Sequence, residues 1–396
     1  MRLPVLLMSV VFLLSIAVDT YLYRIIASRC RKKCWSRTYL YSSIILIIFL
    51  VSVVCVPRRS ETGDSLTVIM WSLFGYVTVY LPKVLCVFSD AVSCIPSLWG
   101  GRRWRAVSVS GAMLAVTVCV AMWWGALVNR FALNVENVEV NVPDLPPAFD
   151  GYRMVQISDL HVGTYGNDTA FVSAIVDRIN AQNADAVLFT GDAVNRRTDE
   201  LLPFVKPLSR LRANDGVYSI LGNHDYGDYI DWGSEESKRE NMELMYRLQY
   251  EMGWRLLRNE HEMLYRGNDS IALVGVENWG DPPFPTYGSL SKAYPSMSDS
   301  VVKVLLTHNP AHWVSEVKDD EKVNIALTLS GHTHAMQVSM CGLSPAAWRY
   351  PTWGGCYESK SGRCVLYVNI GIGTVGVPMR LGATPEITVI TLKRSK

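Results

Sequence analysis

Four apolar runs in the first 130 residues place the strongest constraint on the fold. Each run approaches the roughly 20 residues that cross a bilayer as an α-helix, and charged or turn residues bound each one. A cleaved secretory signal does not fit the first run, because no small-residue cleavage site follows it and three more runs come after it. The sequence therefore predicts an all-α membrane domain of four transmembrane helices over residues 1–130. The four runs are Leu3 to Ile25, Tyr39 to Val56, Leu66 to Phe88, and Val107 to Val128.

The net charge changes sign where these runs end. Residues 1–130 contain 14 Lys and Arg against 4 Asp and Glu, whereas residues 131–396 contain 24 against 32. An acidic globule binds nucleic acid poorly, because non-specific affinity comes from basic side chains that neutralise phosphates. We therefore expect a linker over residues 131–150 and a soluble domain over residues 151–396. The expected partners include the lipid bilayer but no nucleic acid, and the oligomeric state is not indicated.

Basic residues between the apolar runs predict the orientation in the membrane. Short loops rich in Lys and Arg stay in the cytoplasm. Such residues follow the first and third runs, which puts the domain after residue 130 outside the cytoplasm. We expect a multi-pass protein of the inner (plasma) membrane with an extracytoplasmic domain, periplasmic in a Gram-negative cell. The basic residues are Arg29, Arg31, Lys32, Lys33 and Arg37 in one loop and Arg102, Arg103 and Arg105 in the other.

Asp19 and Lys83 are ionisable residues inside the apolar runs. Charges at such depth are costly and are usually paired or functional. The two side chains either pair with each other or reach separately toward the membrane interface, and the sequence leaves both readings open.

After residue 130, short β-rich runs alternate with helical runs, which is typical of an α/β domain. The connector Asn129 to Asp150 begins with an alternating stretch, Leu133 to Val142, that indicates an extended strand before several prolines end it. The other predicted strands are Met154 to Ile157, Ala186 to Phe189, Val217 to Leu221, Ile271 to Val276, Val302 to Leu306, Ile325 to Leu329, Val365 to Asn369 and Ile387 to Leu392. The predicted helices are Thr169 to Ala181, Glu200 to Leu211, Glu235 to Met252 and Pro310 to Val317.

Polar side chains follow five of these strands and include five of the seven histidines. Ligands of α/β sheets bind beyond the carboxyl ends of the strands, so these side chains can converge. His261 and His312 lack this context and are interpreted as ordinary surface or partly buried residues. In chain order, the strand ends carry Asp159 and His161, then Asp192, then Asn223, His224 and Asp225, then His308, and finally His332 and His334.

Seven of these residues have side chains that bind divalent cations. Carboxylate, amide and imidazole groups without cysteine suit Mn²⁺, Fe²⁺ or Zn²⁺ better than a thiolate-bound structural zinc. One catalytic ion normally takes three protein ligands, so seven ligands with one bridging carboxylate predict two ions about 3.5 to 4 Å apart. If the stretch after Gly331 is extended, His332 and His334 lie on one face and can each bind a different ion. The seven candidates are Asp159, His161, Asp192, Asn223, His308, His332 and His334.

The order of these motifs resembles the calcineurin-like metallophosphoesterases. That family has Asp-x-His, Gly-Asp, Gly-Asn-His-Asp/Glu, a lone His and Gly-His-x-His, and all five occur here between Asp159 and His334. The stretch Gly151 to His161 and the ending Pro385-Glu-Ile-Thr are similar to a membrane-attached bacterial branch of the family. The resemblance covers roughly residues 145 to 392. It implies a metallophosphoesterase-type sandwich of two mixed β-sheets flanked by helices.

The resemblance also implies a division of the ligands. One ion would be bound by Asp159, His161, Asp192 and His334, and the other by Asp192, Asn223, His308 and His332, with Asp192 as the bridge.

Four further residues take implied roles from the same resemblance. His224 would protonate the leaving oxygen or stabilise the transition state, and Asp225 would orient His224 through a hydrogen bond. Arg380 matches a position near the site and would contact phosphate. The branch commonly has two glycines before Gln337, where this chain has Ala335 and Met336, so Met336 is expected to affect the substrate pocket.

The segment Cys341 to Cys364 is unlike a strand or a helix. Its aromatic residues, which include Trp348, Tyr350 and Trp353, form a lid, enter a membrane interface, or pack on their own domain. Its three cysteines allow one disulfide in an oxidising compartment.

The expected function is a membrane-anchored, dinuclear-metal phosphoesterase that hydrolyses a phosphodiester or related ester by attack of a metal-bridging hydroxide. A lipid-linked substrate at the membrane surface and a soluble ester both remain open. One alternative is a membrane-anchored metal-binding sensory or interaction module without turnover, and another is a metal-dependent amidohydrolase. The presence of His224 and Asp192 favours the phosphoesterase.

Overall fold

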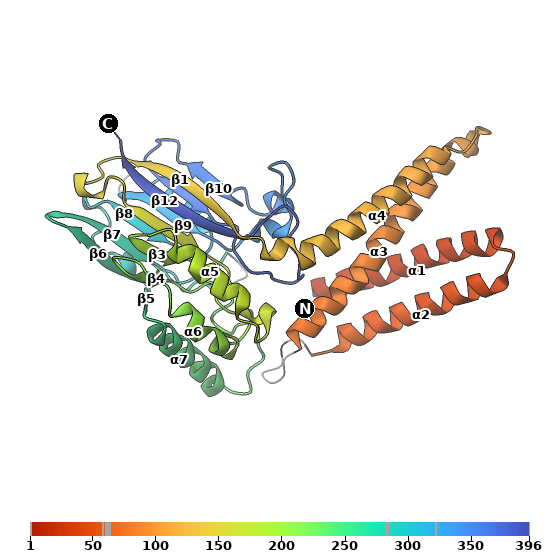
Figure 1. Ribbon diagram of the computed structural model, residues 1–396, viewed down its shortest axis with the longest axis horizontal. Helices are drawn as coiled ribbons and strands as arrows, with labels where there is room; N and C mark the ends of the chain where they lie inside the picture. Colours follow the sequence, from red (N-terminus) through yellow and green to blue (C-terminus); the bar gives the residue numbers. More distant parts are fainter. Residues whose placement is uncertain (1, 58, 60–64, 282–284, 321–322, 396) are drawn as a thin grey trace. The chain divides into compact units, whose positions relative to one another are not determined.

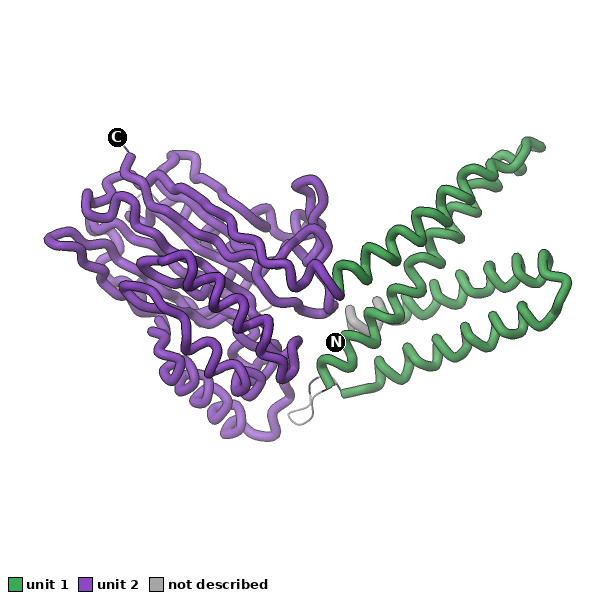
Figure 2. Tube along the Cα trace, viewed as in Figure 1, with its two compact units in different colours: residues 1–58, 64–126 green, residues 59–63, 127–396 purple. Residues whose placement is uncertain are grey.

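The computed structural model describes residues 2–57, 59, 65–281, 285–320 and 323–395. These residues form two compact units, which Figure 2 shows in different colours. The first unit comprises residues 1–58 and 64–126, and the second comprises residues 59–63 and 127–396. The second unit therefore begins before the predicted linker.

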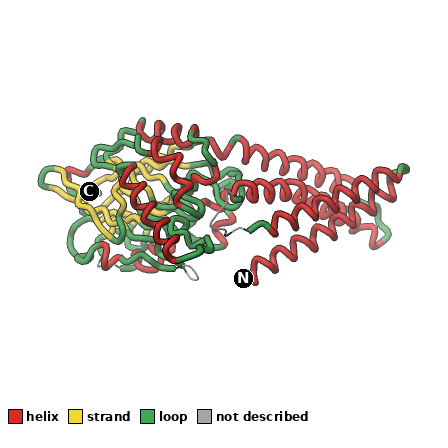
Figure 3. The backbone as a smooth tube through the Cα atoms, turned by 90° about the horizontal axis from the view of Figure 1, so that it is seen from below, coloured by secondary structure: helices red, strands yellow, loops and turns green. Residues whose placement is uncertain are grey.

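The first unit is built from helices long and apolar enough to cross a membrane, as the sequence predicts (Figures 1 and 3). Large apolar side chains such as Leu13, Ile45 and Met113 are exposed on its surface. A helix that is apolar on its outward face suits lipid rather than water. The helices are α1 (Arg2–Arg29), α2 (Lys33–Cys55), α3 (Leu66–Cys94) and α4 (Arg105–Leu127), with a short 3₁₀ helix, Ile95–Trp99, after α3.

A buried polar cluster joins three of these helices. Asp19 of α1 accepts hydrogen bonds from Tyr39 of α2 at 2.6 Å and from Tyr80 of α3 at 2.5 Å. Lys83 of α3 donates to the same carboxylate at 2.9 Å. Of the two readings left open by the sequence, the structure shows the paired one.

The second unit is a sandwich of two mixed six-stranded sheets (Figures 1 and 3). The first sheet has the order β1 (Asn134–Val142), β12 (Glu386–Arg394), β2 (Arg153–Ile157), β3 (Ala186–Phe189), β4 (Val217–Ser219), β5 (Trp254–Leu256). The second has the order β10 (Gly355–Glu358), β11 (Val365–Val368), β9 (Ile325–Ser330), β8 (Lys303–Leu306), β7 (Asp269–Gly275), β6 (Glu260–Arg266). In each sheet four adjacent strands run parallel: β2 to β5 in the first, and β11, β9, β8 and β7 in the second.

The strands at the centre are buried on both faces. Met154 and Leu188 point into the core between the sheets, whereas Val155 and Val187 pack against helices on the outer face of the first sheet. Continuous apolar runs are the expected sequence of such parallel strands. The outer helices are α5 (Ala170–Asn180), α6 (Val205–Leu208) and α7 (Glu235–Glu251) over the first sheet, and α8 (Leu290–Ala293) with the π-helix Trp313–Val317 over the second.

Nearly half of the predicted linker, Asn134–Val142, is a strand of the first sheet. β1 pairs in parallel with β12 over its whole length, from Asn134 opposite Glu386 to Val142 opposite Arg394. The alternation of apolar and polar residues did indicate an extended strand, but its partner comes from the far end of the chain. Residues 131–150 therefore belong to the folded domain.

Other elements also differ from prediction. The helix predicted over Glu200 to Leu211 is a 3₁₀ helix, Thr198–Phe204, followed by the single turn α6. Pro203 and Pro207 explain this, since proline lacks the backbone donor that an α-helix needs. Strands β5, β6 and β10 were not predicted, and β10 together with a 3₁₀ helix, Pro345–Trp348, lies in the segment expected to be irregular. In the described part of the chain no disulfide joins Cys341, Cys356 and Cys364.

Candidate metal centre

The seven predicted ligands follow strands of both sheets. Asp159, Asp192 and Asn223 come after β2, β3 and β4 of the first sheet, and His308 and His332 come after β8 and β9 of the second. The parallel strands direct these loops to the same end of the sandwich. His161 and His334 lie two residues further along their loops. Six of the seven form two groups in which the possible ligand atoms lie within 4.8 Å of one another.

The first group is Asp159, His161 and His334. The Nε2 atoms of the two histidines lie 3.0 Å apart, and His334 Nε2 lies 3.1 Å from Asp159 Oδ1. His161 Nδ1 lies 3.1 Å from the carbonyl oxygen of Val194, which only accepts, so this nitrogen carries the proton. Nε2 of His161 is thereby left with a lone pair directed at the cluster. This is how histidines are oriented in metal sites.

The second group is Asp192, His308 and His332. His308 Nε2 lies 3.1 Å from Asp192 Oδ2 and 3.3 Å from His332 Nδ1. His308 Nδ1 donates to the carbonyl oxygen of Thr190 at 2.7 Å. Asp192 also lies between the groups, since its Oδ2 is 3.6 Å from His161 Nε2.

Asn223 is placed beside the second group. The backbone N–H of the next residue, His224, donates to Asp192 Oδ1 at 2.8 Å. The Asn223 amide nitrogen donates to Tyr229 at 2.8 Å, whereas its Oδ1 is buried without a hydrogen-bond partner. A buried acceptor without a donor is costly, and a cation would satisfy it.

Backbone conformation brings these side chains together. Asp159, His161, Asp192, His332 and His334 all have positive φ, between 44° and 73°. The stretch His332 to His334 is therefore not extended, as predicted, but turns through the left-handed region. That turn sends the two histidines to different groups.

Gly331 allows the close approach of the two sheets at the site. A side chain there would collide with Ser158 and with the carboxylate of Asp159. The backbone N–H of His332 donates to both oxygens of that carboxylate, at 3.2 and 3.0 Å. In the structure this glycine packs the loop directly on a predicted ligand.

The electrostatics of the cluster favour positive charge. Burial lowers the pKa of His308, but the nearby Asp192 carboxylate outweighs it and raises that pKa to about 9. Burial and the charge of His308 together lower the pKa of His332 to about 3. Burial opposes ionisation of Asp192, yet the surrounding imidazoles hold its pKa well below the usual range. Two ionised carboxylates, several imidazole nitrogens that converge on them and the unpaired Asn223 oxygen fit divalent cations.

Comparison with known proteins agrees with this geometry. Residues 152–336 match the family described as calcineurin-like phosphoesterase, and residues 1–130 match the one described as probable calcineurin-like phosphoesterase, transmembrane domain. The chain is 33% identical over 257 residues to the uncharacterized metallophosphoesterase YkuE of Bacillus subtilis, which covers 63% of this chain and 82% of that protein. The chain belongs to the calcineurin-like phosphoesterases.

Relatives of this phosphoesterase occur in animals as well as bacteria. A Danio rerio protein named transmembrane protein with metallophosphoesterase domain is 29% identical over 383 residues, which covers 92% of this chain and 82% of that protein. A solved structure, phosphopantetheinyl hydrolase from Mycobacterium tuberculosis, is 13% identical with a TM-score of 0.34, covering 58% of this chain and 91% of that one. So low a score supports no conclusion.

His224 lies beside the candidate metal centre of the phosphoesterase, but the Asp225 side chain forms its hydrogen bonds elsewhere. The ring of His224 packs edge-on against His161 and stacks on Tyr229, with centroids 4.8 and 4.4 Å apart. Its Nδ1 lies 2.6 Å from the carbonyl oxygen of Asn195, which is the orienting partner. The prediction for Asp225 is therefore wrong.

Asp225 instead holds the loop that carries Asp192. Its buried carboxylate accepts the backbone N–H groups of Asp192, Ala193 and Val194, at 2.8 to 3.2 Å, and that of Gly222 at 2.9 Å. Burial and the charge of Asp192 raise its pKa to about 7 despite these bonds. The resemblance implied a His–Asp pair, whereas the Asp225 side chain satisfies backbone donors of another loop.

Arg380 is buried behind a ligand and is not placed to contact phosphate, contrary to prediction. Its side chain is fully buried and donates to the carbonyl oxygens of Gly373, Ile370 and Ala383, at 2.8 to 3.1 Å. Its Nη2 lies 3.2 Å from Nδ1 of His334. Burial lowers its pKa to about 10, so it stays charged at neutral pH and fixes the far edge of that imidazole.

Met336 and two tyrosines border the centre. Ala335 and Met336 have φ of 51° and 46°, the conformation that favours the glycines expected there, and Met336 is 46% exposed. Tyr350 places its hydroxyl 2.9 Å from His332 Nε2. The sequence offered Tyr350 as one aromatic of an irregular segment, but it gave no signal for Tyr229.

The two remaining histidines lie outside the centre. His312 is fully buried, not partly exposed, and contacts Thr307 and Glu316. His261 is exposed, and its Nδ1 donates to the carbonyl of Ala293.

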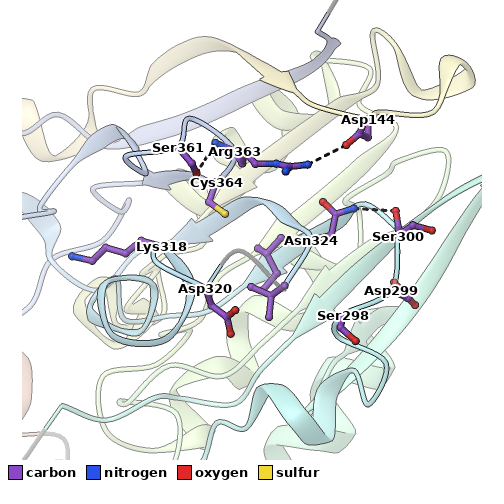
Figure 4. Close-up of a pocket in the computed structure, with 12 residues that line it drawn as sticks. Asp144, Ser298, Asp299, Ser300, Lys318, Asp320, Asn324, Ser361, Arg363 and Cys364 are labelled. Atoms are coloured by element: carbon purple, nitrogen blue, oxygen red, sulfur yellow. Dashed lines mark hydrogen bonds and ion pairs between the residues drawn. The ribbon is translucent and has the colours of Figure 1, made fainter.

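A cavity of about 480 Å³ lies at the other end of the second sheet, before β8 and β9 begin (Figure 4). Its basic residues Lys318 and Arg363 are accompanied by acidic Asp144, Asp299 and Asp320. None of the predicted ligands lines it, so it has no part in the metal centre.

Proposed function

We propose that this protein is a membrane-anchored, dinuclear-metal phosphoesterase that hydrolyses a phosphodiester or a related phosphate ester. The observation that carries the proposal is the pair of adjacent ligand groups that share one end of the sandwich, with Asp192 between them and His224 at their edge. Membership in the calcineurin-like phosphoesterases supports the reaction class.

The proposed ligands of one ion are Asp159, His161, Asp192 and His334, and those of the other are Asp192, Asn223, His308 and His332. Their donor atoms suit manganese, iron or zinc. The Asp192 carboxylate lies 3.1 Å from His308 Nε2 and raises the pKa of that imidazole, so this position favours positive charge.

Each group of side chains then has a chemical task. When bound, the two ions would neutralise the charge on the phosphate oxygens. They would also lower the pKa of a bound water, which makes that water a nucleophile toward phosphorus. His224 Nδ1 donates a hydrogen bond to the Asn195 carbonyl oxygen. Nε2 is therefore the ring nitrogen that would donate a proton to the departing ester oxygen. Tyr229 stacks on His224 and fixes the plane of its ring.

The proposed location of this chemistry is outside the cytoplasm, in the periplasm of a Gram-negative cell. The support is the basic residues between α1 and α2 and those at the start of α4. They favour a cytoplasmic position for the α1–α2 loop and for the loop before α4.

An Asp192→Asn variant tests the proposal, because it removes the charge shared by both proposed ions. The purified full-length protein, loaded with Mn²⁺, is compared with the variant for metal content and for turnover of bis(p-nitrophenyl) phosphate. We expect about two bound ions in the unmodified protein, and in the variant a loss of metal with activity lowered by at least about 1,000-fold.

Asp319→Asn, at an exposed position, is the matched control and should keep both metal and activity. Two tightly bound ions and full turnover in the Asp192→Asn protein would contradict the ligand assignment. Bound metal in the unmodified protein without turnover of phosphodiesters, phosphomonoesters or extracted lipids would favour a binding module.

A further inference from the structure

Four large apolar side chains are exposed within 13 residues, immediately after the metal centre. They are Met336, Met340, Leu343 and Trp348, with exposed fractions of 46%, 76%, 76% and 92%. We call residues 336–348 the apolar loop. Single exposed apolar residues are common on soluble domains, whereas a gathering of them marks an interaction surface.

The apolar loop has a defined backbone. Met340 and Leu343 exchange backbone hydrogen bonds of 2.9 and 3.0 Å across a tight turn in which Cys341 and Gly342 have positive φ. This turn presents the two side chains next to each other at its tip. The base is held by Gln337, whose side-chain amide donates to the carbonyl oxygens of Val377 and Met379 at 2.9 Å. The exposure is therefore built into the fold.

The apolar loop shares an edge of the second unit with the point where the chain leaves α4. Asn129, two residues after α4 ends, donates to the backbone carbonyl of Arg380 at 2.9 Å. The next residue, Leu381, pairs with Gln337 and Ser339 through backbone hydrogen bonds of 2.8 and 2.9 Å. This edge is therefore the part of the second unit that the chain enters directly after a candidate membrane-spanning helix.

The composition of the loop favours lipid over a polar partner. No Asp or Glu occurs between His334 and Glu358. The single basic residue in that interval, Arg349, forms an ion pair with Asp281. Tryptophan and apolar side chains in a segment without acidic residues of its own are favoured at the boundary between lipid headgroups and acyl chains.

The loop is also connected to the proposed ligands at both ends. Met336 follows His334 by two residues, and Tyr350, two residues after Trp348, contacts His332. A surface that touches lipid here would place lipid headgroups next to the metal centre.

We propose that the apolar loop inserts into the bilayer surface and that the substrate is the phosphate ester of a membrane lipid, taken directly from that surface. This inference rests on the proposed phosphoesterase function for its substrate, but the insertion itself does not.

Insertion is tested on the full-length protein in nanodiscs of phosphatidylethanolamine and phosphatidylglycerol. A photo-crosslinking Leu343→p-benzoylphenylalanine variant should yield lipid adducts on the loop peptide. The same substitution at Tyr265 is the matched control, because that residue is equally exposed but lies beside the β6–β7 turn, at the sheet end opposite the metal centre. We expect several-fold more lipid adducts at position 343. Equal yields, or adducts to protein alone, would overturn the insertion.

Substrate presentation is tested by a ratio of rates. The triple variant Met340→Ser, Leu343→Ser, Trp348→Ser is assayed on phospholipid in nanodiscs and on soluble bis(p-nitrophenyl) phosphate. We expect the lipid rate, relative to the soluble rate, to fall by about 10-fold or more, whereas Tyr265→Ser leaves the ratio unchanged. An unchanged ratio in the triple variant would overturn lipid presentation. If the unmodified protein hydrolyses neither ester, the phosphoesterase function fails, while adducts at position 343 still establish insertion.

Discussion

Single residues in this protein carry strain where the metal ligands are proposed. Five of the seven candidates have left-handed backbone conformations, which cost an L-residue roughly 1–2 kcal/mol. Such strain persists only where neighbouring groups impose it. Here the backbone N–H of Asp159 donates to Gly191, that of His161 to Asp192, and that of His332 to the Asp159 carboxylate. The stability of the fold thus maintains these strained backbone conformations, which direct the side chains toward one point.

Arg380 is expected to act on the metal centre through His334. An Arg380→Lys variant keeps the positive charge but cannot serve three carbonyl oxygens and the imidazole at once. Loss of a partner behind a metal-binding histidine typically lowers metal affinity or activity by about 10- to 100-fold. We expect the Mn²⁺ dissociation constant of the variant to rise by that factor, measured by titration, and part of the lost activity to return at high Mn²⁺.

Arg363→Lys, on an exposed arginine paired with Asp144, is the control for this substitution. If Arg380→Lys loses activity with unchanged metal affinity, the arginine does not position a ligand. The thermal unfolding temperature of the metal-free variant separates this role from general destabilisation, because added metal would also stabilise a weakened fold.

At the scale of helices, the cluster around Asp19 fixes how α1, α2 and α3 pack. Two tyrosine hydroxyls and the Lys83 ammonium satisfy one carboxylate that is 6% exposed. Removing one member of a buried ion pair leaves the other charge uncompensated, which costs about 3–5 kcal/mol. Asp19→Asn or Lys83→Met alone should therefore lower the thermal unfolding temperature of the detergent-solubilised protein by several degrees.

The double variant Asp19→Asn, Lys83→Met distinguishes pairing from separate contacts with the interface. Replacement of both charges is often close to neutral, so the double variant should recover at least half of the lost stability. If the two effects simply add, Lys83 and Asp19 do not depend on each other, and the helices are held by their apolar contacts.

Most of the strands that the sequence predicts are buried on both faces, and the exception is the edge strand β1, which was predicted from its alternating apolar and polar residues. β3 consists of consecutive apolar residues, and so does β8 after Lys303, because each strand packs between a helix layer and the other sheet. Edge strands gave weaker signals: β6 exposes Glu260 and His261, and β5 has three residues. Their pairing depends on distant partners, which local sequence does not encode.

For the whole molecule, the candidate site depends on the packing of one sheet against the other. The amide of Gln156 at the end of β2 donates to the carbonyl of Ser330 at the end of β9, at 2.9 Å, and His308 donates to Thr190 across the same gap. The order of motifs made the ligand types predictable. The roles of Arg380 and Asp225 were not predictable, because both depend on which loops meet when the sheets pack.

The chain also has a predicted orientation in the membrane. Basic residues lie before α2 and before α4, so the positive-inside rule keeps those loops in the cytoplasm. With four spans, we therefore expect both the N-terminus and the domain after α4 to lie outside. We expect an alkaline phosphatase fused to the C-terminus to be active in a bacterial host, because that enzyme needs disulfides that form outside the cytoplasm. A green fluorescent protein fused at the same point is exported by the same route and should not fluoresce.

A fusion placed after Arg105, at the start of α4, gives the matched control with three spans. It should show the reverse pattern, inactive phosphatase and bright fluorescence, because the fusion point then lies with the basic loop. Changing Arg102, Arg103 and Arg105 to Gln weakens this signal and should raise phosphatase activity at the three-span fusion. An inactive C-terminal phosphatase with a fluorescent C-terminal reporter would place the metal centre in the cytoplasm and confine its substrates to that side.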